Sequence, residues 1–166
     1  MVSELFDKIT SVYGYTYIIP AICTFGILCN LINLSVLFNR RLKESPYTYL
    51  TGLAVSDLLS LFFINTTTFT RGSWFSKTVQ VDYWLKKLER QLFLPSANIF
   101  SALSVAIIGT LTIERYLFIK FPLKAIGYCS PKIARRIMAL LFVCVLCFRF
   151  PMYLFFDVKY DFKPDT

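Results

Sequence analysis

The sequence contains no histidine and few charged residues, and both shortages narrow its possible functions. Charged residues make up 17% of the 166 positions and hydrophobic residues 56%, whereas a soluble globular domain carries about 25% charged residues. Without histidine, the chain lacks the commonest general base, metal ligand and near-neutral pH switch. Because no nucleophile–base spacing is present either, we expect that the chain is not an enzyme.

The distribution of cysteines and basic residues argues against a disulfide-stabilised protein and against a nucleic-acid-binding protein. The five cysteines are odd in number, and four of them lie inside apolar runs, so they do not form a disulfide framework. The formal net charge is +8, but the lysines and arginines gather between apolar runs and do not line one face. We therefore expect no nucleic-acid partner.

Long gaps between charged residues define four apolar segments. The longest gap, from Lys8 to Arg40, holds 31 uncharged residues, and two other segments contain a single charged residue each, Asp57 and Arg149. A helix needs about 20 mostly apolar residues to cross a membrane, and lipid cannot satisfy free backbone groups. The sequence therefore predicts an all-α membrane protein, a single domain over 1–166 with four transmembrane helices at about 15–38, 48–70, 93–119 and 134–156.

The predicted connections differ in length and character. The first, 39–47, is short and basic, so the first two helices should be antiparallel neighbours. The second, about 71–92, is expected to be a long loop whose aromatic residues suit the membrane interface or a ligand-contact surface. Nine lysines and arginines on one side of the membrane against eight on the other leave the orientation undecided. Seven acidic residues on the second side tip it towards an extracellular amino terminus.

Asp57 lies in the middle of the second apolar segment. An ionisable group at a helix centre costs about 2.5–3.5 kcal/mol on insertion scales and usually faces partners inside a bundle. Asn30 and Asn33 on the first segment and Ser104 on the third could supply amide and hydroxyl partners. Two interpretations stay open at this point: a structural hydrogen-bond hub between helices, and a site for a hard cation or a proton.

A second group, Glu114-Arg115-Tyr116, ends the third apolar segment and is followed by Pro122. Adjacent opposite charges at a membrane boundary could pair with one another and lower the cost of partial burial. An ordinary pair of side chains reaching the interface explains the same pattern. Arg149, late in the fourth segment, could likewise reach the outer surface or a ligand.

These residues carry a resemblance to a known family. The motifs, in chain order, are Gly26-Ile27-Leu28-Cys29-Asn30, Leu53-Ala54-Val55-Ser56-Asp57-Leu58 and Glu114-Arg115-Tyr116, with Pro122 and Pro151 following. Their order and spacing resemble the first four helices of a rhodopsin-like (class A) G-protein-coupled receptor. Within that family, segments 45–54 and 95–100 are most similar to invertebrate FMRFamide-like neuropeptide receptors.

The resemblance implies roles for individual residues. Asp57 would form a sodium-linked activation site with Asn30 and Ser104. Arg115, within the motif that Tyr116 completes, would be held by Glu114 at rest and released towards a G protein on activation. The loop that begins at Pro122 would be cytoplasmic, so the protein would be a multi-pass plasma-membrane protein with an extracellular amino terminus.

The chain also departs from the family pattern. The cysteine expected 25 positions before Arg115 is replaced by Arg90, and the usual tryptophan of the fourth helix is absent. The sequence stops at Thr166, before a fifth, sixth or seventh helix. We therefore expect a receptor truncated after helix four, which does not signal alone. A fragment, an incomplete gene model and a natural truncation that pairs with a full-length receptor all stay open.

The alternative function is a self-contained four-helix membrane scaffold or channel subunit. The sequence has no acidic ring and no glycine-rich pore segment that would favour a channel. The expected partners are membrane lipid and, within an intact receptor, a heterotrimeric G protein and a peptide ligand. No cofactor is expected apart from a sodium ion at Asp57.

Overall fold

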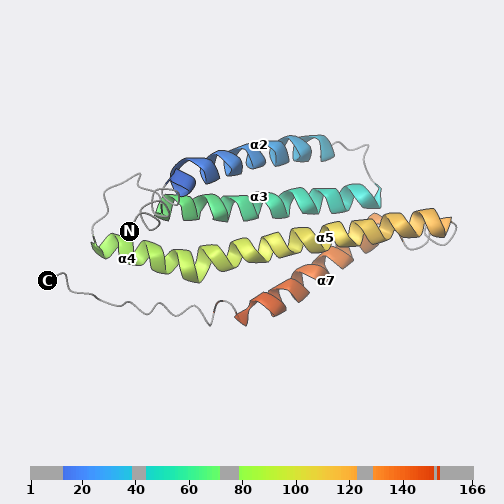
Figure 1. The fold of residues 1–166 in the computed structure, drawn as a ribbon. Helices are drawn as coiled ribbons and strands as arrows, with labels where there is room; N and C mark the ends of the chain where they lie inside the picture. The colour runs from blue at the N-terminus through green and yellow to red at the C-terminus, as the bar shows by residue number, and fades with distance from the viewer. Residues whose placement is uncertain (1–12, 39–43, 72–78, 123–128, 152, 154–166) are drawn as a thin grey trace, which may run out of the picture.

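The computed structural model describes residues 13–38, 44–71, 79–122, 129–151 and 153, and the regular structure in these ranges is helical (Figure 1). The elements are η1 (Gly14–Ile18), α2 (Ile19–Leu37), α3 (Ser45–Arg71), α4 (Val79–Leu88), η2 (Glu89–Phe93), α5 (Leu94–Lys120) and α7 (Pro131–Arg149). The all-α class predicted from the sequence is therefore confirmed.

Two of the helices contain a short π-helical stretch. η1 runs directly into α2, and η2 joins α4 to α5, so that each set forms one continuous helix. Pro20 follows η1 and Pro95 follows η2, each by two positions. Proline lacks an N–H and its ring clashes with the carbonyl four residues earlier. A local widening to π geometry relieves this clash, which explains why both π stretches precede a proline.

The third helix begins much earlier than the sequence suggested. We expected it over 93–119 after a long loop, but residues from Val79 onward are already helical. The charged residues of α4 made it look like a loop, whereas Asp82 and Lys86 pair one turn apart on the helix surface. The 41 residues Gln80–Lys120 form a helix about 60 Å long, about twice the thickness of a hydrocarbon core. One end of this helix therefore extends beyond the apolar layer.

Helix α3 lies at the centre of the arrangement. It packs against α2 on one side and α5 on the other, while α7 crosses beneath α5 at an angle and also contacts α3 (Figure 1). Tyr49, Leu103, Ile107 and Ala134 form the buried core, one or two residues from each of α3, α5 and α7. A Cβ atom at Gly52 would lie 2.5 Å from Met138 Sδ, so this glycine lets α7 approach α3 closely, as small residues do between membrane helices.

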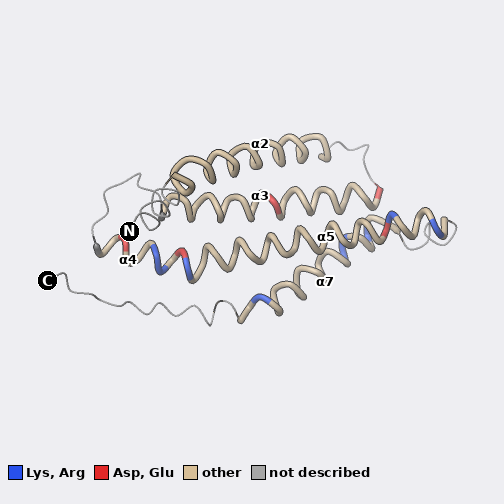
Figure 2. The backbone as a smooth tube through the Cα atoms, in the orientation of Figure 1, with Lys and Arg blue, Asp and Glu red and all other residues tan. Residues whose placement is uncertain are grey.

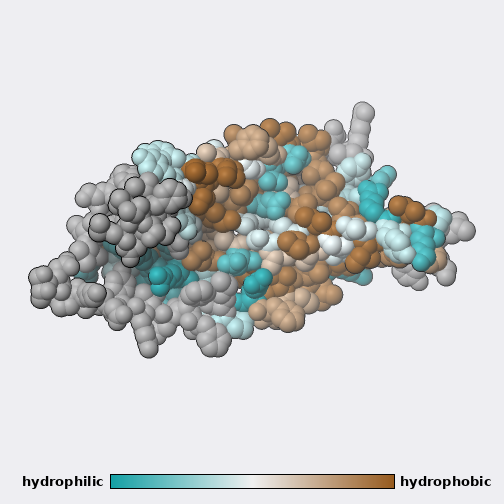
Figure 3. All heavy atoms as spheres, viewed as in Figure 1, coloured by the Kyte–Doolittle hydropathy of each residue, from teal (hydrophilic) through white to brown (hydrophobic). Residues whose placement is uncertain are grey.

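Three of the described helices are long and apolar enough to cross a membrane: Gly14–Leu37, Ser45–Thr70 and Gln80–Lys120. The predicted fourth span, 134–156, is helical over its described part but does not meet this test there. Helix α7 begins at Pro131 and is described to Arg149, with three basic residues in its first two turns. Residues 152 and 154–156 of that prediction lie outside the described residues. In the space-filling view, apolar residues cover much of the middle of the visible face, with some polar residues among them (Figure 3).

Polar contacts join α3 to the third helix at three levels. Near the start of α3, Ser45 Oγ donates to Glu114 Oε2 over 2.8 Å. In its middle, Ser60 Oγ donates to the carbonyl of Ala97 over 3.3 Å. At its far end, Thr70 Oγ1 donates to Glu89 Oε2 over 2.6 Å. Hydrogen bonds between polar side chains stabilise helix association in lipid. These contacts therefore fix the antiparallel register of the two helices.

Candidate functional site

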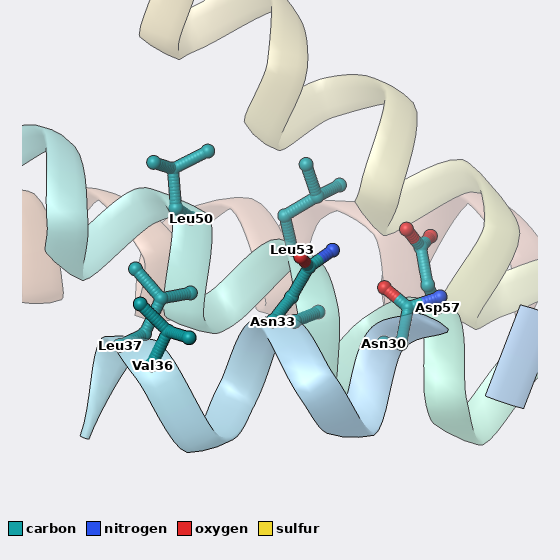
Figure 4. A pocket seen from close by; sticks show the side chains of 8 residues that line it. Asn30, Asn33, Val36, Leu37, Leu50, Leu53 and Asp57 are labelled. Carbon is teal, nitrogen blue, oxygen red and sulfur yellow. The ribbon is translucent and has the colours of Figure 1, made fainter. Parts of the chain in front are cut away.

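Asp57 lines a cavity between α2 and α3. The cavity has a volume of about 340 Å³ and is lined by Asn30, Asn33, Val36 and Leu37 from α2 and by Leu50, Leu53, Ala54 and Asp57 from α3 (Figure 4). Asp57 and the two asparagines are its polar lining residues, and the rest of the wall is aliphatic. The cavity therefore places one carboxylate and two amides in a largely apolar surrounding.

The hydrogen bonds around Asp57 leave oxygen atoms free. Asn30 Nδ2 donates to the carbonyl of Gly26 over 3.0 Å, so its Oδ1 is the atom left to face a ligand in the cavity. Asp57 is half-buried, and no described residue forms a hydrogen bond or an ion pair with its carboxylate. A carboxylate and an amide oxygen on facing helices are the type of ligand that binds hard cations.

Ser104 is not part of this constellation. It is buried at 6% exposure, but it does not line the cavity of Asp57. Its hydroxyl donates to the carbonyl of Phe100 on its own helix over 3.1 Å. Serine hydroxyls within helices commonly bond the carbonyl four residues earlier. The structure thus brings Asn30 and Asp57 together but not Ser104.

Glu114 faces the interior of the bundle. Its side chain is 7% exposed, and Oε2 accepts the hydrogen bond from Ser45 at the start of α3. Oε1 is also buried and has no hydrogen-bond partner among the described atoms. A buried carboxylate is stable only where polar groups face it, so the hydrogen bond from Ser45 contributes to holding Glu114 in the bundle.

Arg115 is exposed, and in the described part of the structure it does not pair with Glu114. Arg115 is exposed while Glu114 is buried, and no ion pair between the two is found in the described part of the chain. Neighbouring positions on an α-helix lie about 100° apart and do not face each other. The carboxylate is therefore held by Ser45, a residue that the sequence did not single out, and Arg115 stays accessible.

Tyr116 and Pro122 lie on the surface near Arg115. Tyr116 is 54% exposed, and its hydroxyl accepts a hydrogen bond of 2.8 Å from Lys120 Nζ. Helix α5 ends at Lys120, Phe121 leaves the helical conformation, and the exposed Pro122 follows. A residue before proline avoids the α conformation, which explains this ending.

Cys129 is partly buried just before α7, close enough to Glu114 for their charges to interact. Burial raises the pKa of its thiol, and the negative charge of Glu114 raises it further. A thiol with a raised pKa stays protonated at neutral pH and reacts slowly.

Glu89 is a buried polar residue that the sequence analysis did not single out. It is 2% exposed and bonds to Thr70, although its position had been assigned to a loop. The apolar residues of α4 and η2 that alternate with charges at helical spacing were the available signal. Arg149, by contrast, is exposed at the end of the described part of α7.

The fold and these positions define the class of protein: a helical membrane bundle with buried and half-buried polar residues between its helices. Residues 30–164 match the family model of the 7 transmembrane receptor (rhodopsin family), and the chain belongs to that family. It is 34% identical over 141 residues to a Caenorhabditis elegans protein described as a probable G-protein coupled receptor. That match covers 83% of this chain and 32% of the relative, so the chain spans about a third of the relative's length. Membership of a receptor family agrees with the expectation that the chain is not an enzyme.

Proposed function

We propose that these helices form the first part of a G-protein-coupled receptor for an FMRFamide-like neuropeptide, with the remaining helices supplied by the rest of an intact receptor. The observation that carries this proposal is the position of a buried Glu114 next to an exposed Arg115 at one end of the bundle, in a chain of the rhodopsin family. The nematode origin of the relative supports an invertebrate receptor. The peptide specificity rests on the sequence resemblance of segments 45–54 and 95–100.

The proposed receptor lies in the plasma membrane with its amino terminus outside and lipid around its apolar belt. In that orientation the ends of α3 and α5 that carry Ser45 and Glu114 face the cytoplasm. Activation of such a bundle is a population shift between two helix arrangements. The hydrogen bond from Ser45 stabilises the arrangement described here, and its loss would free Glu114 while Arg115 contacts the G protein.

Sodium is the ion proposed for the cavity of Asp57. The residues fit it, because the Asp57 carboxylate and the Asn30 amide oxygen have no donor that occupies them among the described residues. Asn33 lines the same cavity and offers a second amide. A bound sodium ion supplies positive charge that neutralises the carboxylate. Asp57 and Asn30 would hold the ion between α2 and α3.

This chain by itself is proposed not to signal, because a two-state bundle needs helices on the faces that α5 and α7 leave uncovered. A full-length receptor is the proposed partner if the chain occurs alone. The alternative of a self-contained scaffold or channel subunit gains no support from the family match.

The test uses an intact receptor that contains this chain, stimulated with synthetic FMRFamide peptide. We expect Arg115→Ala to reduce G-protein activation by tenfold or more, on the order of 1.4 kcal/mol of lost coupling, and to change peptide affinity by less than about threefold. The measurements are nucleotide exchange on the G protein and radioligand binding on the same membranes.

Lys120→Ala is the matched control, since Lys120 lies on the same end of α5 and is also exposed. It should leave both quantities near those of the unmodified receptor. Equal losses of binding and activation in Arg115→Ala would indicate misfolding and contradict the proposed role. No response to the peptide at all would contradict the neuropeptide assignment alone.

A further inference from the structure

Helix α7 has one face that packs on the bundle. Ala134 is buried at 1% exposure within the core. Ile137, Met138 and Leu141 pack against the same core. The spacing of these positions is that of one side of a helix, and the residues described on the opposite side are exposed.

The opposite face is basic at its start and apolar afterwards. Lys132, Arg135 and Arg136 are exposed in the first two turns. Leu140 and Val143, one and two turns further along, are 62% and 54% exposed. Side chains four positions apart stack on the same side of a helix, so Arg136 and Leu140 belong to one continuous strip.

The positive charge of this strip is not neutralised from within the described chain. No described carboxylate pairs with Lys132, Arg135 or Arg136. At the same end, Glu114 is buried against Ser45, and Glu44 is exposed just before α3. Figure 2 shows lysines and arginines at the adjoining ends of α5 and α7 and few acidic residues there.

Local geometry favours an anion at the same place. Ser130 caps α7, its Oγ accepting from the backbone N–H of Ile133 over 3.3 Å, and the start of a helix carries partial positive charge. Arg135 Nε donates to the carbonyl of Pro131 over 3.3 Å. This bond fixes the guanidinium near the helix start and leaves its terminal nitrogens for an outside acceptor.

We infer that this face of α7 binds an anionic phospholipid. The headgroup lies against Lys132, Arg135 and Arg136, and an acyl chain follows Leu140 and Val143. Charge complementarity selects the anionic lipid over a zwitterionic one, and each basic side chain near such a surface contributes about a fivefold preference. The inference goes beyond the receptor function and does not depend on G-protein coupling or on the peptide.

The test measures lipid retention by the full chain, purified in mixed micelles with equal amounts of phosphatidylserine and phosphatidylcholine. Native mass spectrometry counts the lipids of each kind that stay bound. We expect several-fold enrichment of phosphatidylserine, and a loss of about tenfold or more of this preference when the three basic residues are replaced. The test variant is Lys132→Gln, Arg135→Gln, Arg136→Gln.

A control with the same change of charge at the other end of the bundle separates a site from bulk attraction. That control is Lys86→Gln, Lys87→Gln, Arg90→Gln, and it should keep the preference. Phosphatidylglycerol should replace phosphatidylserine without loss, because the site recognises charge. No preference in the unmodified chain, or an equal loss in both variants, would overturn the inference.

A second measurement uses the unmodified chain and so does not depend on the folding of the triple variant. In the unmodified chain, raising the salt concentration from about 0.05 to 0.5 M should weaken phosphatidylserine retention, because exposed charges are screened. A retention that does not change with salt would contradict the inference even if the triple variant cannot be purified.

Discussion

Asp57 and Glu114 are both acidic residues within the membrane-spanning helices, but their surroundings differ. Glu114 has a hydroxyl donor, Ser45, and points into the bundle. Asp57 faces a cavity with two amides and has no described donor. A carboxylate that already has a protein donor is suited to hold a conformation, whereas one without a donor is suited to take an ion from outside the chain.

We predict that Asp57→Asn removes the sodium dependence of agonist affinity in an intact receptor that contains this chain. The substitution keeps the shape of the side chain and removes the charge that attracts the ion. Binding of FMRFamide peptide would be measured with and without sodium chloride, using N-methylglucamine chloride to keep ionic strength constant. Surface expression should stay close to that of the unmodified receptor.

Ser104→Ala is the informative comparison for that experiment. Because Ser104 bonds to Phe100 and does not line the cavity, its replacement should leave the sodium effect in place. Sodium sensitivity that survives Asp57→Asn would reduce Asp57 to a hydrogen-bond hub between helices.

Cys129 offers a pH-dependent prediction outside the membrane spans. Burial and the charge of Glu114 raise the pKa of its thiol above the ordinary value of about 8.5. The reactive thiolate is therefore scarce at pH 8, and alkylation by iodoacetamide should accelerate only as the pH rises beyond this ordinary value. Site-resolved mass spectrometry of the full chain in nanodiscs would follow the rate.

Removal of the nearby charge should move the pH profile of Cys129 in a known direction. Glu114→Gln takes away one of the two causes of the raised pKa, so Cys129 should react faster at pH 8. Glu44→Gln changes an exposed charge before α3 and should have no such effect. A Cys129 that reacts at pH 8 faster than an unstructured cysteine peptide would contradict this account.

At the scale of the elements, a hydrogen bond to a buried carboxylate joins α3 to the third helix at each end of their contact. Ser45 bonds to Glu114 at one end, and Thr70 bonds to Glu89 at the other. Glu89 sits in the π-helical stretch that precedes Pro95. Its carboxylate lies in the interface with α3, where Glu89 is 2% exposed.

We predict that Glu89→Gln and Thr70→Val each destabilise the full chain and that their effects are not additive. A hydrogen bond to a charged group contributes about 1.5–3 kcal/mol, and contacting residues couple by about 0.5–3 kcal/mol in a double-mutant cycle. The free energy of unfolding would be measured by SDS titration in mild detergent micelles.

The control for this cycle is Asp82→Asn, on the neighbouring turns of the same helix. Asp82 pairs with Lys86 on the helix surface, and exposed pairs of this kind contribute about 0.3–0.5 kcal/mol. Its loss should change stability little. Additive effects of Glu89→Gln and Thr70→Val would mean that their hydrogen bond does not link the two helices.

The sequence predicted helices wherever apolar runs were long, and it failed where charge and helix coincide. The runs around Asn30, Asp57 and Ser104 identified the first three spans to within a few residues, apart from the start of the third. Charges on α4 masked its helical spacing, so its residues were assigned to a loop. The spacing of the apolar segments was enough to place Asn30 and Asp57 on neighbouring helices. The Ser104 hydroxyl bonds to its own backbone because of its rotamer and packing. A sequence does not report either of these.

The hydrogen bond between Ser45 and Glu114 was not predicted from the sequence, for a related reason. Adjacency in sequence separates side chains around a helix, while the true partner, Ser45, comes from a segment 69 positions away. Contacts between distant segments depend on how the helices cross. The single sequence contains no direct signal for that crossing.

At the scale of the whole molecule, the described helices are consistent with the first part of the helical bundle of a rhodopsin-family receptor. The match over residues 30–164 covers most of the chain, and the relative is about three times longer than the aligned part. Exposed apolar side chains remain along α2, α5 and α7. In the proposed receptor, lipid and further helices cover these surfaces.

The measurement that tests this account most directly is the sequence of the transcript that encodes the chain, read beyond the codon for Thr166. The account predicts an open reading frame that continues through three more apolar spans, each of about 20 residues or more. A stop codon directly after Thr166 would contradict the proposal that these helices work within one seven-helix receptor chain.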